Sequence, residues 1–235
     1  MRFDDIDFGA LYRAHMARVP ERRKGAKDWD VRAPALAKTV SGSRYADAFL
    51  ARMNFDGCRT LLDVGCGPGA IAIAAAPRLD RVYGLDFSQA MLDALVTHAR
   101  DRGLSNIHPI LRAWEDDWSD VPVCDIAVAS RSTMVPDLAA SLAKLEAHAR
   151  RRVYITKLAG GRFLGEDVYR AIGRDDEAMP DYIYAVNLLR QRGIHPTVDY
   201  IDGGNRLAGC ESFDDCAKRV AWSLGELNER ERAGL

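Results

Sequence analysis

The segment Asp63-Val64-Gly65-Cys66-Gly67-Pro68-Gly69 joins two apolar stretches of different character. Residues 60–64 are typical of a buried strand, and residues 70–76 are small and apolar, as in a helix. Three glycines between a strand and a helix let backbone N–H groups approach a ligand closely, because no side chain stands in the way. The segment therefore predicts a ligand-binding turn.

Asp86 stands 17 residues after Gly69, at the end of a second apolar run over residues 82–85. A carboxylate at the tip of the next strand can accept hydrogen bonds from both hydroxyls of a ribose. The glycine spacing, with Ala70, also satisfies the looser glycine-x-glycine-x-x-alanine fingerprint of dinucleotide-binding proteins. These residues alone predict a nucleoside pocket and leave open which cofactor it takes.

Composition limits the other classes of function. The 235 residues are 48% apolar and fit one large domain, or one domain with a lid. The net charge of −1, from 33 basic and 34 acidic side chains, argues against a nucleic-acid partner. No run of about 18 apolar residues and no signal peptide are visible, so we expect a cytoplasmic protein without a membrane partner. The five cysteines lack metal-binding spacing, so reduced thiols and no metal site are expected.

From residue 60 onward, apolar strand-like runs alternate with helical segments. The runs cover residues 60–64, 82–85, 107–111, 126–130, 153–158 and 197–201. Short apolar strands that alternate with helices predict an α/β fold, with a mainly parallel twisted sheet covered by helices on both faces. Residues 1–55 lack strand character and are expected to form a helical N-terminal cap.

Residues 61–69 and 84–88, together with Met91 and Leu92, resemble the first two motifs of class I S-adenosylmethionine-dependent methyltransferases. Those proteins carry an acidic residue two positions before the first glycine, as Asp63 is here, and often have cysteine-glycine-proline-glycine in this loop. The whole chain is similar to a group of uncharacterised prokaryotic methyltransferase-like proteins. The resemblance implies a Rossmann-like class I methyltransferase fold with a six- or seven-stranded sheet, although a seventh strand is hard to find after residue 201.

The resemblance implies that the chain binds S-adenosylmethionine and yields S-adenosylhomocysteine. The methionyl part would follow the backbone of residues 65–69, with Asp63 orienting its ammonium, and the ribose would rest on Asp86. Adenine would lie against Phe87 and near Met91. The family's usual adenine-edge aspartate aligns with an alanine here, so a tryptophan and a glutamate after the third strand are expected instead. The cofactor site is thus expected to contain Asp63, Gly65, Cys66, Gly67, Gly69, Asp86, Phe87, Met91, Trp114, Glu115 and Ser130.

Methyl transfer mainly requires that the protein position the two reactants. Arg131, at the carboxyl end of the fourth strand, is expected either to hold a substrate carboxylate bidentately or to form an ion pair with a helix. Tyr182, Tyr184 and Trp29 are the other acceptor-site candidates. The acceptor pocket is expected between the end of the fourth strand, a helical insert over residues 159–195 and the N-terminal cap. No catalytic residue is identified.

The expected organisation is a single methyltransferase domain over residues 1–235. It comprises the cap (1–55), a cofactor-binding core (56–158), a helical insert on the substrate side (159–195), and the last strand or strands with a C-terminal helix (196–235). The expected function is methyl transfer to a small-molecule acceptor. The alternatives are an RNA or protein methyltransferase, a non-catalytic S-adenosylmethionine-binding protein and, less favoured, an NAD-dependent oxidoreductase. The chain leaves open whether it is a monomer or a homodimer.

Overall fold

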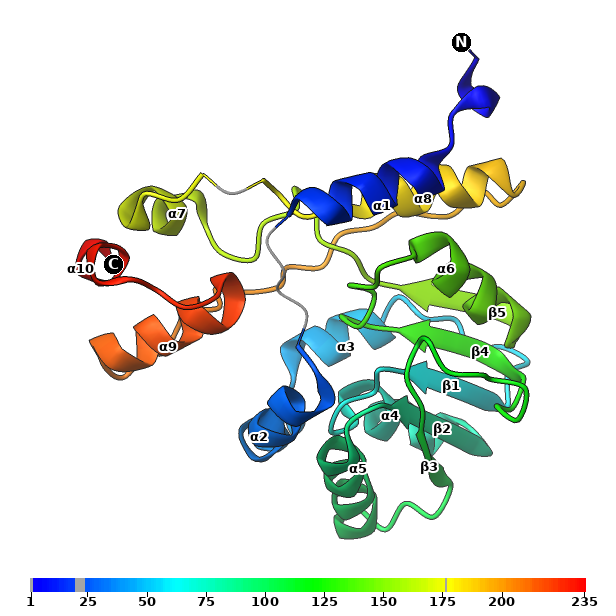
Figure 1. The fold of residues 1–235 in the computed structure, drawn as a ribbon. Helices are drawn as coiled ribbons and strands as arrows, with labels where there is room; N and C mark the ends of the chain where they lie inside the picture. The colour runs from blue at the N-terminus through cyan, green and yellow to red at the C-terminus, as the bar shows by residue number, and fades with distance from the viewer. Residues whose placement is uncertain (1, 20–23, 176) are drawn as a thin grey trace. The chain divides into compact units, whose positions relative to one another are not determined.

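The computed structural model describes residues 2–19, 24–175 and 177–235, and its chain forms two compact units (Figure 1). Residues 24–157 form the first, which we call the sheet unit. The second, the helical unit, combines the chain before residue 24 with residues 158–235. The cap expected over residues 1–55 is therefore divided between the two units.

The sheet unit is built on a parallel sheet that has five strands among the described residues. They are β1 (Thr60–Val64), β2 (Arg81–Asp86), β3 (Ile107–Leu111), β4 (Cys124–Ala129) and β5 (Ala149–Ile155), in the order β3-β2-β1-β4-β5. The central strands are apolar on both faces, and Leu61, Leu62 and Val64 are fully buried. This is the Rossmann-like parallel architecture that the alternation of strands and helices predicts.

The predicted strand count of six or seven is wrong. Residues 197–201, the expected sixth strand, lie outside the sheet and form no strand in the described chain, and residues 206–209 form turns instead of a seventh. Val198 and Tyr200 are 45% and 60% exposed, and Asp199 lies between them. A buried parallel strand is apolar on both faces, whereas this segment alternates with polar residues and leaves its apolar side chains in solvent.

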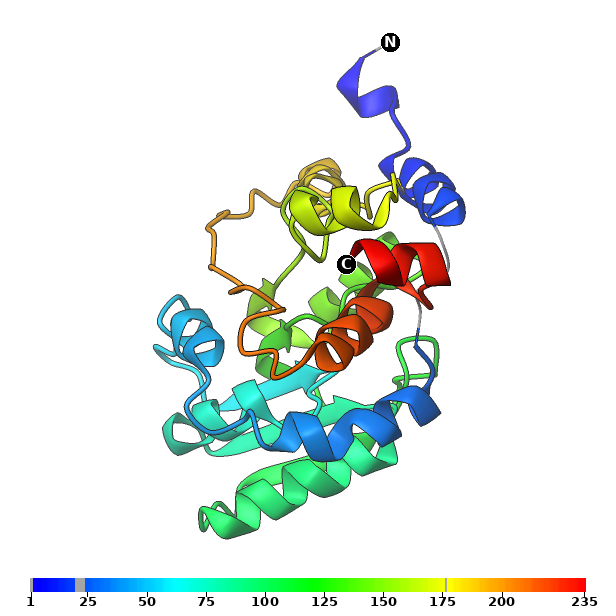
Figure 2. The same ribbon diagram turned by 90° about the vertical axis from the view of Figure 1, so that its left-hand side faces the viewer.

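Five helices surround the sheet: α2 (Ala26–Ala37), α3 (Arg44–Leu50), α4 (Ala70–Ala75), α5 (Gln89–Asp101) and α6 (Leu138–Ala147), with a short 3-10 turn, η2 (Ala76–Arg78), after α4. Helix α5 packs on β2 and β3, α6 packs on β4 and β5, and α2 lies beside α5 (Figure 2). The chain steps from β1 to β3 in one direction and from β4 to β5 in the other. Right-handed crossovers therefore place α4 and α5 on the face opposite α6.

The helical unit contains η1 (Phe3–Asp5), α1 (Phe8–Arg18), α7 (Glu166–Ile172), α8 (Tyr182–Gln191), α9 (Phe213–Leu224) and α10 (Glu229–Gly234). Helix α1 packs on α8, and α7 packs on α10. Val168, Ile172, Val220 and Leu224 lie in its buried core. None of the described helices of either unit is long and apolar enough to cross a membrane.

Candidate functional site

The glycine loop of residues 65–69 runs from β1 into α4 and is tied to the neighbouring strand. The N–H groups of Gly65 and Cys66 both donate to the carbonyl oxygen of Leu85, over 2.7 and 3.1 Å. Gly65 has φ +67°, and a Cβ atom there would lie 2.2 Å from the Cβ of Ser132. Only glycine fits this position, because the backbone conformation and the close approach both exclude a side chain.

Asp86 ends β2 and joins the two predicted motifs directly. Its side chain accepts hydrogen bonds from the N–H of Gly67 (2.8 Å) and from the N–H of Ser88 (2.9 Å), one on each carboxylate oxygen. The residue is 5% exposed, and this burial raises its pKa, against the opposing effect of the N–H donors. The carboxylate therefore holds the loop in place, and each of its oxygens can still accept one further hydrogen bond.

Asp63 is still more deeply buried, at 1% exposure, on β1. Its carboxylate accepts one hydrogen bond from the N–H of Ala72 in the first turn of α4, at 3.1 Å. Burial raises the pKa of Asp63 to about 7, and the nearby charge of Asp86 adds to the rise. Burial also raises the pKa of the Cys66 thiol, so this cysteine stays protonated near neutral pH.

Helix α2 contributes a contact that the sequence did not reveal. Asp30 accepts hydrogen bonds from the Ser88 hydroxyl (2.6 Å) and from the N–H of Ala90 (3.3 Å), at the start of α5. This contact places Trp29, the preceding residue on α2, in the same unit as the glycine loop. Phe87 is 38% exposed beside this contact, whereas Met91 is buried beneath the loop, its sulfur 4.0 Å from where a Cβ on Gly67 would lie.

The segment after β3 is hydrogen-bonded to helix α6. Lys144 donates to the carbonyl oxygens of Trp114 (2.7 Å) and Asp116 (2.6 Å). The indole N–H of Trp114 donates to the carbonyl oxygen of Ser132 at 2.9 Å, and its ring stacks on Trp118. That N–H therefore has an acceptor within the protein, whereas Glu115 is exposed in the same segment.

Ser130 and Arg131 follow β4 and meet two residues that the sequence analysis did not single out. The Ser130 hydroxyl lies 2.8 Å from the phenol oxygen of Tyr45, on α3. The guanidinium carbon of Arg131 lies 3.4 Å from the centre of the Tyr45 ring. Thr156, directly after β5, completes this group. All of these residues belong to the sheet unit.

Tyr182 and Tyr184 lie on α8 in the helical unit and have different partners there. The Tyr200 hydroxyl donates to the Tyr182 hydroxyl at 2.8 Å, near the surface. Tyr184 bonds Nδ1 of His15 at 3.0 Å and packs edge-on against Tyr12. The predicted roles of both tyrosines in acceptor binding stay predictions.

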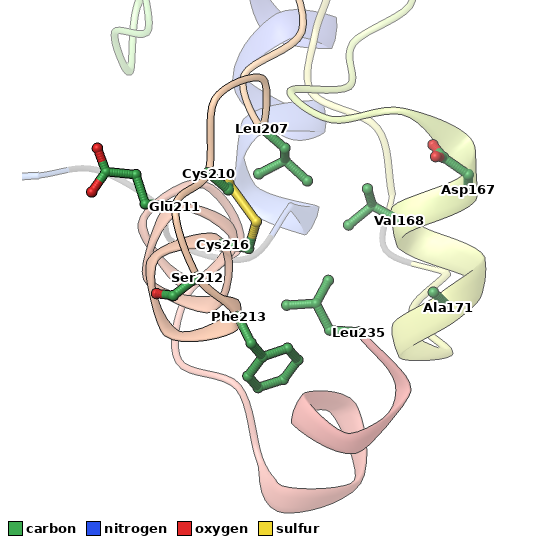
Figure 3. Close-up of a pocket in the computed structure, with 10 residues that line it drawn as sticks. All are labelled: Asp167, Val168, Ala171, Leu207, Cys210, Glu211, Ser212, Phe213, Cys216 and Leu235. Atoms are coloured by element: carbon green, nitrogen blue, oxygen red, sulfur yellow. A yellow bond between two sulfur atoms is a disulfide. The ribbon is translucent and has the colours of Figure 1, made fainter.

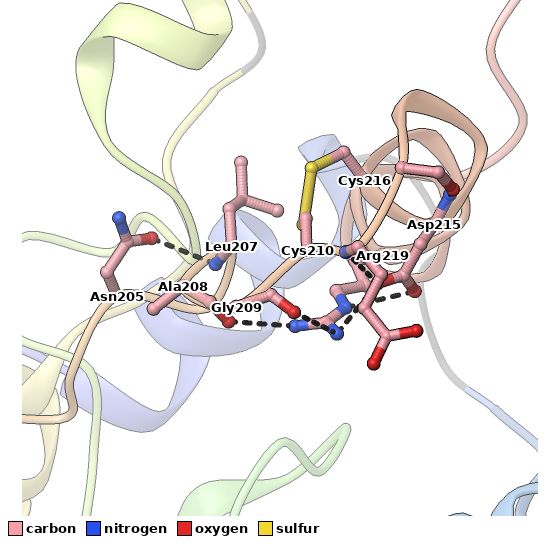
Figure 4. The surroundings of a disulfide bond; sticks show 10 residues. Asn205, Leu207, Ala208, Gly209, Cys210, Asp215, Cys216 and Arg219 are labelled. Carbon is pink, nitrogen blue, oxygen red and sulfur yellow. Dashed lines mark hydrogen bonds and ion pairs between the residues drawn. A yellow bond between two sulfur atoms is a disulfide. The ribbon is translucent and has the colours of Figure 1, made fainter.

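The helical unit also holds a cavity of about 410 Å³ that no sequence motif predicted (Figure 3). It is lined by Asp167, Val168, Ala171, Leu207, Cys210, Glu211, Ser212, Phe213, Cys216 and Leu235. Cys210 and Cys216 form a disulfide, which corrects the expectation that all five cysteines are reduced (Figure 4). The Ser212 hydroxyl accepts the N–H of Asp215 and caps the start of α9, and Cys216 lies in the first turns of this helix. Cys58, Cys66 and Cys124 are free and buried.

The two buried carboxylates, Asp86 and Asp63, decide whether the site fits a nucleoside cofactor with an amino group. Gly67 and Ser88 each donate to one oxygen of Asp86, and the carboxylate can accept two more hydrogen bonds, the number that the two hydroxyls of a ribose supply. Asp63 is a buried anion-forming group beside the glycine loop, where a ligand's ammonium would stabilise its charge. The residues present therefore fit S-adenosylmethionine. Among the described residues no group of His, Cys, Asp and Glu side chains is arranged to hold a metal ion.

Comparison with known proteins agrees with this geometry. A family model described as a methyltransferase domain matches residues 61–152. An uncharacterised protein of Haemophilus influenzae is 38% identical over 237 residues, which cover 100% of this chain and 88% of that protein. Nocamycin O-methyltransferase of Saccharothrix syringae is 36% identical over 88 residues, 36% of this chain and 31% of that enzyme. The match thus spans only about a third of either.

A solved structure extends the likeness to most of the chain. In the complex that contains the Haloferax volcanii Trm112 methyltransferase activator, one chain matches with a TM-score of 0.54 and 18% identity, over 84% of this chain and 94% of that one. At this identity the match shows a shared fold. With the glycine loop, Asp86 and the parallel sheet, these similarities show that the chain belongs to the class I S-adenosylmethionine-dependent methyltransferase family.

Proposed function

We propose that the protein transfers the methyl group of S-adenosylmethionine to a small-molecule acceptor. One observation carries the cofactor part of the proposal: the buried carboxylate at the tip of β2, Asp86, is hydrogen-bonded to Gly67 in the glycine loop. A carboxylate in this place can accept the ribose hydroxyls while the loop backbone follows the methionyl part. The ends of β1 and β2 then form one nucleoside site.

The other contacts follow from this arrangement. Asp63 would hold the ammonium of the methionyl part, and Phe87 and Met91 would flank the adenine. Trp114 would meet the adenine with its ring, because its N–H already donates to Ser132. Glu115 and Ser130 would line the adenine edge and the sulfur side, respectively.

When bound, S-adenosylmethionine supplies a methyl group on a positively charged sulfur that leaves as a neutral thioether. The chain's own residues bind and orient the two reactants, which is the main requirement for in-line displacement. No residue is proposed as a general base.

Two features support a small acceptor. The balanced charge, 33 basic against 34 acidic side chains, gives no general attraction for polyanions such as RNA. The local match to an enzyme named for O-methylation of nocamycin agrees with this choice. A small acceptor, cytoplasmic location and absence of a nucleic-acid partner all stay predictions.

Titration calorimetry tests the cofactor part. We expect S-adenosylmethionine and S-adenosylhomocysteine to bind the intact chain and Asp86→Ala to weaken both by at least about tenfold, because a buried ribose loses its acceptor. Asp101→Ala, which removes an exposed carboxylate at the end of α5, is the matched control and should bind normally. Asp86→Asn keeps one acceptor oxygen and should fall between. Binding of NAD without binding of S-adenosylmethionine would instead favour the dinucleotide-dependent oxidoreductase.

Transfer itself is tested with S-adenosylmethionine labelled in its methyl group. The protein is incubated separately with a metabolite extract, with RNA and with a protein fraction, and label is expected in the metabolites alone. Label in RNA or protein would overturn the small-molecule acceptor. Cofactor binding without label in any fraction would favour a non-catalytic binding protein.

A further inference from the structure

We propose that Tyr45, Ser130, Arg131 and Thr156 form an oxyanion subsite that binds a carboxylate of the ligand at the carboxyl ends of β4 and β5. These strands are adjacent and parallel, so their carboxyl ends lie at the same edge of the sheet, where ligands bind in open α/β folds. Tyr45 comes from α3 and approaches this edge from outside the sheet.

The backbone at Arg131 is held in an unusual conformation. Among the described residues, Arg131 is the one non-glycine with a positive φ, at +58°. Its backbone N–H donates to the hydroxyl oxygen of Thr156 at 2.8 Å. A side chain is held in the left-handed region only where its surroundings demand it, and such positions gather at functional sites.

The Arg131 side chain is also held in place, but no carboxylate of the described chain neutralises its charge. The guanidinium lies over the Tyr45 ring, 3.4 Å from its centre, where the electron-rich face of the ring attracts it. Within the part of the chain that the structure describes, this guanidinium makes no hydrogen bond and no ion pair. The expected ion pair with a helix carboxylate is therefore not formed among the described residues. Arg131 is exposed, and its N–H donors are available to a ligand.

The hydroxyl groups of Tyr45, Ser130 and Thr156 lie beside Arg131, and one of their three hydrogens is not used within the group. Tyr45 donates to Thr156 over 3.2 Å, and Ser130 and Tyr45 share a bond of 2.8 Å. Three hydroxyl hydrogens therefore serve two bonds between hydroxyls. With Tyr45 donating to Thr156 and Ser130 donating to Tyr45, the hydrogen of Thr156 is left for a ligand.

A site with more donors than acceptors selects an oxyanion. The fork of an arginine matches a planar carboxylate in particular, because two parallel N–H···O bonds can form. Two ligands of the proposed reaction can carry such a group: the acceptor, which we favour, and the methionyl part of the cofactor. The acceptor assignment rests on the proposed methyl transfer, whereas the anion site itself does not.

The first part of the test determines whether the bound carboxylate belongs to the acceptor or to the methionyl part of the cofactor. Arg131→Met and the control Arg100→Met, an exposed arginine on α5, are titrated with S-adenosylhomocysteine and with 5′-methylthioadenosine, which lacks the carboxylate. If the carboxylate belongs to the acceptor, Arg131→Met leaves both affinities unchanged. If it belongs to the cofactor, only the binding of S-adenosylhomocysteine weakens, by about tenfold or more. Arg131→Gly, which suits the positive φ, repeats the test should the methionine variant fold poorly.

The second arm measures transfer of labelled methyl groups to a metabolite extract divided on an anion-exchange resin. We expect label in the anionic fraction, reduced at least about tenfold by Arg131→Met and unaffected by Arg100→Met. Label confined to the neutral fraction would overturn the acceptor assignment.

The third arm needs no activity and keeps the anion site distinct from the proposed function. Malonate, but not malonamide, should shift the amide NMR signal of Arg131 in the intact protein saturated with S-adenosylhomocysteine, and Thr156→Val should weaken this response. A malonate response without transfer would leave the subsite standing and the methyltransferase proposal in doubt. The subsite would be overturned if Arg131→Met changed none of three readouts: the response to malonate, the affinities for S-adenosylhomocysteine and 5′-methylthioadenosine, and methyl transfer.

Discussion

Gly65 shows how tightly the ends of β1 and β4 approach each other. A methyl group at this position would lie 2.2 Å from the Cβ of Ser132, and the backbone there has φ +67°. We expect Gly65→Ala to lower the free energy of unfolding by roughly 2–4 kcal/mol, from backbone strain and overpacking together. Urea denaturation followed by tryptophan fluorescence measures the loss.

The matched control separates these two effects. Gly103 has a similar φ of +64° but nothing within 4 Å of an added Cβ, so Gly103→Ala should cost about 1 kcal/mol from backbone strain alone. Ser132→Gly removes the colliding Cβ and should recover part of the loss in Gly65→Ala. Equal losses for the two alanine variants would show that the approach of Ser132 is not limiting.

Asp63 predicts a particular dependence of stability on pH. The unfolded chain releases the proton of this carboxyl near pH 3.8, whereas the folded protein retains it up to a pKa of about 7. Between these values the folded state binds more protons at Asp63, so the contribution of this group to stability is greatest below pH 4 and is lost as the pH rises towards 7. Each unit of pKa difference corresponds to about 1.4 kcal/mol, which sets an upper scale on the order of 4 kcal/mol.

Asp63→Asn isolates this effect, because asparagine does not titrate in the range. Wild type should lose stability relative to Asp63→Asn between about pH 4 and pH 7, by denaturation at each pH. Three of the four tryptophans, Trp29, Trp114 and Trp118, lie in the sheet unit and report on it. A constant difference between the two proteins across this range would contradict the raised pKa.

At the residue scale, the sequence revealed the groups that lie close together along the chain. The glycines and Asp63 share one loop, and Asp86 follows at a spacing that a strand and helix account for. Tyr45 was missed because its partners Ser130 and Thr156 lie 85 and 111 residues away, and an isolated tyrosine carries no local pattern. The hydrogen bond of Trp114 to Ser132 was equally beyond reach, since it depends on how two strand ends meet.

At the scale of elements, periodicity located the five strands and the helices between them to within a few residues. It failed for residues 197–201, an apolar run that predicted a strand although these residues pair with no other strand in the described chain. Periodicity describes which side chains could be buried and not whether a partner strand exists. The same limit explains why the helices of the cap did not reveal that α1 and α2 belong to different units.

The link between α9 and the loop before it gives a prediction about the cysteines. Arg219 donates to the carbonyl oxygens of Ala208 (3.0 Å) and Gly209 (3.3 Å), so the loop stays beside the helix and Cys210 beside Cys216. Protein purified without reductant, unfolded and treated with iodoacetamide should gain three carbamidomethyl groups by intact mass, and five after reduction.

Cys210→Ser is the control for that measurement. It leaves Cys216 without a partner, so every remaining cysteine should be alkylated with or without reductant. Five modifications of the unreduced wild-type chain would show that the pair is open in the purified protein.

At the scale of the whole molecule, the proposed cofactor residues all fall within one uninterrupted segment. Residues 24–157 contain the complete sheet, its five helices and every cofactor candidate from Asp63 to Ser130. We expect a fragment of residues 24–157 to fold, by circular dichroism, and to bind S-adenosylhomocysteine within about tenfold of the intact chain, because a segment of this length is an ordinary domain. Asp86→Ala in the fragment should weaken that binding by at least about tenfold, as in the intact chain, and an unfolded fragment would show that the sheet unit depends on the rest of the chain.

The helical unit is assembled from both ends of the chain, and this has a consequence for synthesis on the ribosome. His15 on α1 bonds Tyr184 on α8, 169 residues later. At roughly 5–20 residues per second, α1 waits on the order of ten seconds or more for its partner helix to be translated. The sheet unit is made in that interval and can fold as it emerges, while α1 still lacks α8. Helix α1 is therefore made before the sheet unit but packs after it, and until then the side of α1 that α8 later covers is open to chaperones.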